Sequence, residues 1–476
     1  MNNKFVKGAA ILTITTFLSK VLGSFFQIPL QNIAGDEVLG IFRLVFPVYM
    51  IALTLSVAGV PLAISKLIAE LHEKNDENGI AKLFTSASII GVIFGVLGFS
   101  VIMIGSSMFA NMLGGQDTRL PLIVTSFALL IAPYMAVYRG YFQGFGDMIP
   151  TGVSQVIEQF IRVFFMLAIA FLFVYWNKES DVVTGGAMIG SCLGVITSLI
   201  YLRMKYVKSI YRYKSNTYSL QDFKDNAKKI LQVSIPIAVG ALSMPVLNLV
   251  DSVTIPHMLY ESTTTIQEQF GIYSRGFAFT QLIVVFASAM VFPLIPLLTA
   301  ALTKKDRVLA KQTIERTNEL AHVLTTPITI WLMSLMVLSI GILQGINRSK
   351  QAAWIVVGAS FVKVILNIVL VSQFGITGAA YSTLIIYIMI CIVNYIYIRK
   401  ELAYSIHMGR FFAVIGVSSI VGIGLYFTST FINVVDSRLI AIIYSGVAFC
   451  VALFIYGICA LKLNWISKKQ IPFLRK

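Results

Sequence analysis

Charged residues are scarce in this chain: Asp, Glu, Lys and Arg make up 12% of its 476 residues, while 57% are hydrophobic. A soluble domain cannot hide so much apolar surface from water. The composition therefore excludes a soluble globular protein and indicates a polytopic membrane protein. Acidic residues are scarcer than basic ones, which leaves a net charge of +16. The basic residues gather in short segments between apolar runs, so the charge reflects membrane topology and attraction to anionic lipids, and we expect no nucleic-acid partner.

Cysteine and histidine are also rare, with four residues of each, and neither forms a motif. The cysteines lie inside apolar segments without CxxC spacing, so neither a metal site nor a disulfide framework is predicted. HEXXH, Walker A and GxSxG sequences are absent, and we therefore expect no enzyme and no cofactor. Without a nucleotide site, the energy for any transport has to come from a Na⁺ or H⁺ gradient or from the membrane potential.

Long apolar runs fill most of the chain. A run of about 20 apolar residues is long enough to cross a bilayer as a helix. The sequence predicts an all-α fold with 12–14 membrane segments, and thirteen candidate runs are visible. They cover residues 9–33, 40–65, 83–108, 119–140, 152–176, 183–203, 231–256, 271–299, 320–346, 352–373, 377–398, 409–432 and 438–462.

Loop charges predict the orientation, because short cytoplasmic loops carry an excess of Lys and Arg. Loops with Lys66, Lys74 and Lys82, with Arg139, and with Arg399 are basic, whereas the alternate loops are acidic or neutral. Both termini are therefore predicted to be cytoplasmic. The basic stretch 203–229 is predicted to be a cytoplasmic linker, in part an amphipathic helix on the membrane surface.

An internal repeat relates the two halves. Gly40-Ile-Phe opens one apolar run, and Gly271-Ile-Tyr opens another 231 residues later. GYFQG (140–144) recurs as GILQG (341–345) at an offset of 201 residues. The second half is therefore about thirty residues shorter, and the run 320–346 is expected to be a re-entrant hairpin broken at Pro327 or a merged span.

The repeats are separated by an even number of segments, so they are parallel and related by an axis along the membrane normal. This predicts two six-helix lobes facing a central cleft, followed by two extra helices. The expected divisions are 1–206 for the first lobe, 207–229 for the linker, 230–400 for the second lobe and 401–476 for the extra helices and basic tail.

Ionisable residues inside the predicted spans are the candidate functional residues, because such groups are costly in a bilayer. Most of them are cations, and a cationic cleft suits an anionic substrate such as a phosphate. Structural roles remain open: Arg43 and Arg275 can snorkel to headgroups, Glu158 and Arg162 can form an ion pair on one helix face, and Asp251 can hydrogen-bond a neighbouring helix. The candidates for substrate binding are Lys20, Arg43, Arg162, Arg275 and Lys363.

Several stretches taken in order resemble one transporter superfamily. They are KGAAILTITTFLSKVLGSFFQIPLQNIAG, then GIFRLVFPVYMIALTLSVAGVPLAISKLIAE, GYFQG and FGITGAAYSTLI. The chain resembles the multidrug/oligosaccharidyl-lipid/polysaccharide (MOP) exporters, within them the polysaccharide biosynthesis, stage V sporulation protein B and lipid II flippase-like group. The resemblance covers nearly the whole chain.

The resemblance implies a flippase that moves undecaprenyl-diphosphate-linked sugars across the cytoplasmic membrane by alternating access. It implies that Lys20 and Arg275 meet the diphosphate, although Phe26 stands where another cavity arginine is expected. It also implies a sodium site between spans 7, 11 and 12. Asp251, Asn367 and Thr383 fill three of its places, while Val371 stands where a further carboxylate belongs.

We therefore expect a monomeric, multi-pass flippase of a bacterial cytoplasmic membrane, with a lipid-linked diphosphate sugar and anionic lipids as partners. Two alternatives stay open at this level: a drug/cation antiporter of the same architecture, which needs acidic residues in the cleft, and a non-transporting partner in envelope or spore-coat assembly. A membrane-bound glycosyltransferase is a third, weakened by the lack of an acidic metal-binding pair.

Overall fold

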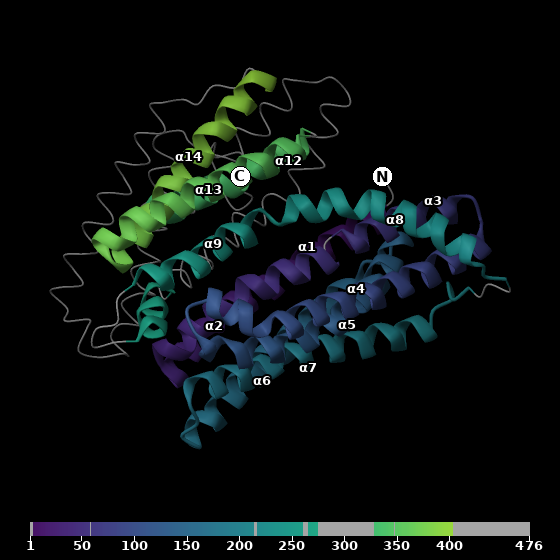
Figure 1. Ribbon diagram of the computed structural model, residues 1–476. Coiled ribbons are helices and arrows are strands. Elements are labelled where there is room, and N and C mark those ends of the chain that lie inside the picture. Colours follow the sequence, from purple (N-terminus) through teal and green to yellow (C-terminus); the bar gives the residue numbers. More distant parts are fainter. Residues whose placement is uncertain are drawn as a thin grey trace, which may run out of the picture. The chain divides into compact units, whose positions relative to one another are not determined.

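The computed structural model describes residues 3–57, 59–213, 217–259, 265–274, 328–346 and 348–402. All regular elements in these ranges are helices (Figure 1), which confirms the predicted all-α membrane fold. The chain divides into two compact units. Unit 1 comprises residues 1–279 and 356–383, and unit 2 comprises residues 280–355 and 384–476.

Three helices form the N-terminal part. They are α1 (Asn3–Phe25), α2 (Gln27–Val57) and α3 (Val60–Glu73). Gly35 interrupts α2 with a φ of 84°, a conformation that glycine adopts without a Cβ penalty. The predicted span 40–65 is helical but is not one continuous helix: Gly59 is left-handed, with a φ of 85°, and α3 starts a new helix with Pro61 in its first turn.

The next four helices agree with the predicted spans to within a few residues at each end. They are α4 (Glu77–Met112), α5 (Arg119–Gly144), α6 (Ile149–Tyr175) and α7 (Ser180–Val207), with a short 3₁₀ helix η1 (Gln116–Thr118) before α5. GYFQG forms the end of α5, where Gly140 and Gly144 let α5 lie directly against α3: an added Cβ would meet Pro61 and Ile68. GYFQG is therefore a motif for close helix packing at the C-terminal end of α5.

The segment after α7 differs from the prediction. The linker is partly helical, because α8 (Leu220–Ala241) begins inside it and continues into the apolar run. The predicted span 231–256 is divided between α8 and α9 (Ser243–Met258), with a break at Leu242. Pro245 lies in the first turn of α9 and has no N–H to donate to the carbonyl of Ala241, which explains the break.

The later helices are α12 (Ile328–Gly345), α13 (Ser349–Phe374) and α14 (Ile376–Leu402). They follow α5, α6 and α7 at offsets close to 201 residues, as the repeat predicted, and GILQG ends α12 as GYFQG ends α5. Residues 328–345 form one helix, and no hairpin lies within them. Pro327, the predicted spans 409–432 and 438–462, and most of 271–299 lie outside the described residues. The predicted lobe boundaries stay a prediction.

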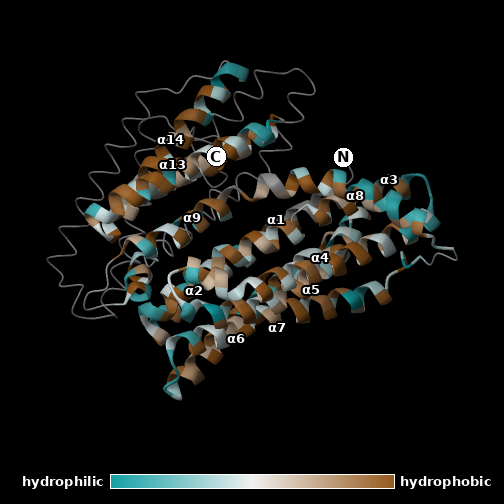
Figure 2. Cartoon of the chain, viewed as in Figure 1, coloured by the Kyte–Doolittle hydropathy of each residue, from teal (hydrophilic) through white to brown (hydrophobic). Residues whose placement is uncertain are grey.

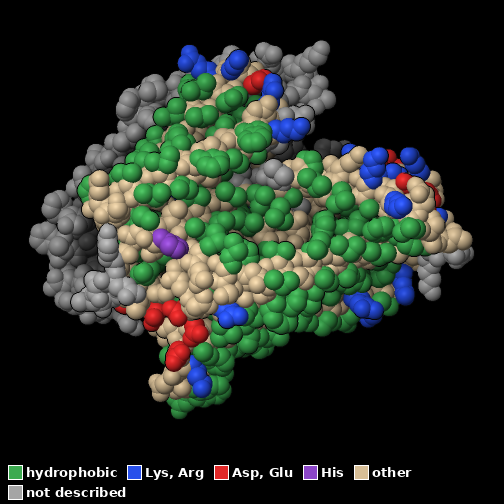
Figure 3. Space-filling model, viewed as in Figure 1, with side chains coloured by type: hydrophobic (Ala, Val, Ile, Leu, Met, Phe, Trp, Pro, Cys, Tyr) green, Lys and Arg blue, Asp and Glu red, His purple; other side chains and the backbone are tan. Residues whose placement is uncertain are grey.

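Seven helical stretches among the described residues are long and apolar enough to cross a membrane, so the chain is a multi-pass membrane protein. Hydrophobic residues run along these helices (Figure 2) and cover the middle of unit 1 on the visible face, while Lys and Arg gather near the α3 and α8 end (Figure 3). The opposite end holds acidic groups: Glu37 accepts a hydrogen bond from Ser180, and Asp117 accepts one from Gln267.

Candidate functional site

A buried charge cluster joins α5, α6 and α7. The carboxylate of Glu158 on α6 binds two guanidinium groups, that of Arg162 at 2.6 Å and that of Arg139 at 2.7 Å. Arg139 also donates to the hydroxyls of Ser154 (3.0 Å) and Ser198 (3.1 Å). The predicted pairing of Glu158 with Arg162 is therefore confirmed. The cluster keeps one positive charge in excess.

The prediction that Arg139 lies in a loop is wrong, whereas its cytoplasmic side stays a prediction. Arg139 lies within α5, and its side chain is only 12% exposed. The misleading signal was its position close to GYFQG at the end of an apolar run. The informative signal was the presence of small hydroxyl residues on α6 and α7, since a buried guanidinium needs several acceptors.

Lys20 lies on the face of α1 that packs against α6. One turn before it, Thr16 donates to Gln155 of α6 at 2.9 Å. Three residues after it, Gly23 lies directly against the side chain of Gln159, which accepts a hydrogen bond from Arg162 at 3.2 Å. Lys20 is thus placed on a polar seam between α1 and α6, and its side chain is exposed.

A second buried cluster joins α9 and α13. The ammonium group of Lys363 lies 2.7 Å from Oδ2 of Asp251, and their side chains are 2% and 6% exposed. Asn367, one turn after Lys363, donates to the other carboxylate oxygen of Asp251 at 3.0 Å and to Thr254 at 2.7 Å. The hydroxyl of Ser382 donates to Asn367. These groups form a closed network of complementary donors and acceptors.

The other predicted residues lie around this cluster or outside the described residues. Arg43 lines a small pocket of about 30 Å³ together with Asp251 and Tyr273. The hydroxyl of Thr383 lies 3.2 Å from that of Tyr273, and Ser382 is the neighbour that contacts Asn367. Arg275 lies outside the described residues.

The geometry therefore separates the predicted cations. Lys20 and Arg162 belong to the α1–α6 seam, whereas Arg43 and Lys363 lie near Asp251. The charge of Lys363 is committed to an internal partner, which disfavours the substrate contact that we predicted for it.

Sodium does not fit the second cluster as the residues stand. Asp251 and Asn367 do come together, as the sodium-site hypothesis requires, but the ammonium group of Lys363 holds one oxygen of Asp251 and the amide of Asn367 holds the other. A metal cation at the same carboxylate would face the positive charge of Lys363 at close range. A hard cation needs oxygen ligands that are not already bound to other groups, and both oxygens of this carboxylate have a partner.

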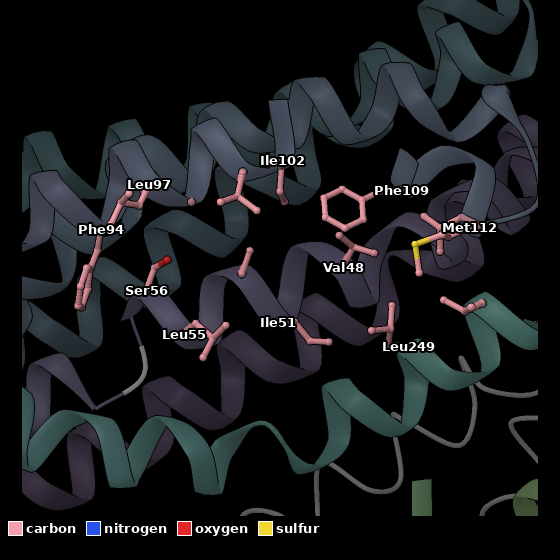
Figure 4. A pocket seen from close by; sticks show the side chains of 15 residues that line it. Val48, Ile51, Leu55, Ser56, Phe94, Leu97, Ile102, Phe109, Met112 and Leu249 are labelled. Atoms are coloured by element: carbon pink, nitrogen blue, oxygen red, sulfur yellow. The ribbon is translucent and has the colours of Figure 1, made fainter. Parts of the chain in front are cut away.

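An apolar cavity of about 380 Å³ opens between α2, α4 and α9. Side chains of the three helices point into it (Figure 4), among them Ile51, Phe94, Phe109 and Leu249, and Ser56 adds one hydroxyl. Such a lining suits a hydrocarbon chain and offers a charged group no partner.

The model of the polysaccharide biosynthesis protein family matches residues 5–302, well over half of the chain. The chain belongs to this family. It is 26% identical to the lipid II flippase MurJ of Bacillus subtilis, over 100% of this chain and 99% of that protein. It is 30% identical to the uncharacterized membrane protein YabM of the same organism, over 98% and 94% of the two chains.

Solved structures agree on the fold. A multidrug resistance MATE family transporter of the MOP superfamily, in an inward-facing conformation, superposes with a TM-score of 0.63 over 82% of this chain and 94% of that chain, at 17% identity. The same kind of transporter in an outward-facing conformation gives 0.57 at 18% identity, over 83% and 96% of the two chains. This protein is therefore a member of the MOP exporter superfamily.

Proposed function

We propose that this protein is a flippase that moves a polyprenyl-diphosphate-linked oligosaccharide across the bacterial cytoplasmic membrane by alternating access, with both termini on the cytoplasmic side. The observation that carries the proposal is the excess of cations along the polar α1–α6 seam: Arg139 and Arg162 share the single carboxylate of Glu158, and Lys20 adds a further ammonium group on the facing helix. The full-length similarity to a protein named lipid II flippase supports the substrate class.

The carboxylates of the apolar helices argue against a drug/cation antiporter. Among the described residues, Glu158 and Asp251 are the acidic groups deep within such helices, and both are bound to basic side chains. A cationic substrate needs a carboxylate that exchanges its counter-ion for the substrate. Breaking either pair for that purpose would leave an uncompensated charge at low dielectric, which is costly.

We assign a role to each cation from the contacts of its side chain and from its exposure. Arg139 has three hydrogen-bond acceptors, Ser154 and Glu158 on α6 and Ser198 on α7, and it therefore links α5 to both helices. Arg162 also donates to Gln159 of the seam at 3.2 Å, and its side chain is 18% exposed. Lys20 is the exposed cation of the seam and is the group that we assign to the diphosphate, together with Arg275. A diphosphate replaces its lost hydration by such charge-assisted hydrogen bonds.

The test is transport of a defined polyprenyl-diphosphate sugar in proteoliposomes. We expect Lys20→Ala to lower the flipping rate about tenfold or more, because a hydrogen bond to a charged group contributes about 1.5–3 kcal/mol. Lys20→Arg should retain most of the rate. The matched control is Lys66→Ala on α3, a lysine whose side chain is 64% exposed and pairs with Glu70.

The same vesicles separate this proposal from its alternatives. Full flipping by both Lys20→Ala and Arg275→Ala would disprove the assigned roles. A scaffold protein would show no flipping in any variant, and a drug/cation antiporter would move an organic cation and leave the diphosphate lipid in place.

A further inference from the structure

We infer that Lys363 is a permanent counter-ion of Asp251: its ammonium group occupies the position beside the carboxylate that a monovalent metal ion would otherwise occupy. Removing the lysine side chain converts the α9–α13 cluster into a sodium site. The inference concerns the ion requirement of the protein and does not depend on the identity of its substrate.

The contacts of Lys363 are those of a bound cation. Its nitrogen lies 2.7 Å from the carboxylate of Asp251 and 3.4 Å from the backbone carbonyl oxygen of Leu247. Both partners are hard oxygen ligands of the kind that coordinate alkali and alkaline-earth ions. Lys363 is 1% exposed and Asp251 is 4% exposed, so the pair is buried.

The repeat explains why the counter-ion is permanent. Lys363 on α13 is the equivalent of Arg162 on α6, at the offset of 201 residues. In the first copy, the partner carboxylate is Glu158 on the same helix, one turn earlier. In the second copy, Ala359 stands at that position, and Asp251 supplies the carboxylate from α9. Both copies of the repeat therefore have a cation at this position. The carboxylate that compensates it lies on the same helix in the first copy and on α9 in the second, where the ion pair links α9 to α13.

The rest of the cluster would remain after the lysine is removed. The carboxylate of Asp251 stays fixed by Asn367, which is itself held by Thr254 and Ser382. Truncation of Lys363 to alanine vacates the volume of the lysine stem and leaves a buried, uncompensated carboxylate beside the Leu247 carbonyl. A sodium ion with water from the membrane surface supplies the missing charge and fits the vacated space.

The test uses the full chain in nanodiscs without substrate. Equilibrium binding of ²²Na⁺ and thermal unfolding in NaCl, KCl and choline chloride at equal ionic strength give two readouts. We expect the natural chain to bind no sodium saturably and to unfold at the same temperature in the three salts. Lys363→Ala should bind one sodium ion and gain several degrees in NaCl over choline chloride. Asp251→Asn/Lys363→Ala should lose both effects, and Lys66→Ala should behave as the natural chain.

Two results would overturn the inference. One is saturable sodium binding by the natural chain that Asp251→Asn abolishes, because the cluster would then hold metal despite the lysine. The other is a lack of sodium binding by both Lys363→Ala and Lys363→Ser. Where either variant does not fold in choline chloride, folding restored by NaCl supports the inference, and failure to fold in both salts contradicts it.

Discussion

Gly40 on α2 and Gly271 in the helical segment 266–274 each lie against the backbone of the other's helix. A methyl group on Gly40 would overlap the carbonyl oxygen of Gln267, and one on Gly271 would overlap that of Asp36. Asp36 and Gln267 each precede their glycine by four residues, so the contact is the same in both directions. A two-fold axis between the repeat copies produces such a symmetric contact, and the sequence repeat predicted that axis.

The glycine contact predicts a matched pair of substitutions. Gly40→Ala and Gly271→Ala should each lower stability by about 1–3 kcal/mol, because overpacking a close helix contact forces the backbones apart. The double variant should lose less than the sum, since one alanine already separates the helices. The midpoint of thermal unfolding measures each effect. The control is Gly358→Ala on α13, where an added Cβ meets nothing within 4 Å. If Gly40→Ala behaved like that control, the contact would not exist in solution.

Glu158 should be the most sensitive member of the first charge cluster. Glu158→Gln leaves two buried guanidinium groups facing a neutral amide, and we expect a loss of about 3–5 kcal/mol in unfolding free energy. Arg139→Gln should cost less, because Glu158 keeps its pair with Arg162. Glu70→Gln, in an exposed pair with Lys66, is the control and should be nearly neutral. Equal losses for Glu158→Gln and Arg139→Gln would contradict this hierarchy.

The start of α8 should loosen from α4 at acidic pH. Asp222 accepts a hydrogen bond from Lys82 at 3.0 Å, and this bond, with those from Ser219, lowers the pKa of the Asp222 carboxyl. A lowered folded-state pKa stabilises the contact above the unfolded pKa, and that contribution is lost as the pH falls through the folded value. Hydrogen-exchange protection factors of residues 217–226 should therefore fall on acidification. Asp222→Asn should show the low protection at neutral pH, and unchanged protection in that variant would refute the role of the pair.

The apolar cavity between α2, α4 and α9 should admit a lipid chain. Phe109 lines it, whereas Phe142 lies in the core of the helix packing and is 3% exposed. Tryptophan at position 109 should be quenched by lipids with brominated acyl chains, and tryptophan at position 142 should be quenched much less. The fluorescence is read against the same background of native tryptophans in both variants. Equal quenching would mean that the cavity is closed to lipid.

The sequence alone determined the class and the helix plan of this protein. Apolar runs longer than a soluble core allows require membrane helices, because an unpaired backbone in lipid is too costly. The repeat placed α12, α13 and α14 as equivalents of α5, α6 and α7, and spacing by four residues placed Glu158 beside Arg162. These are local or periodic properties, which a linear pattern expresses directly.

Only the tertiary structure decided how charges pair between helices. Hydropathy did not show the break between α8 and α9 or the one before α3, because Pro and Gly act through backbone geometry while the residues around them stay apolar. Nor did any linear pattern show that Arg139 reaches Glu158 or that Lys363 neutralises Asp251, more than a hundred residues earlier. A buried charge must find its partner wherever packing brings one within about 3 Å. The sequence supplied the cations, and the packing of the helices decided which of them are already neutralised.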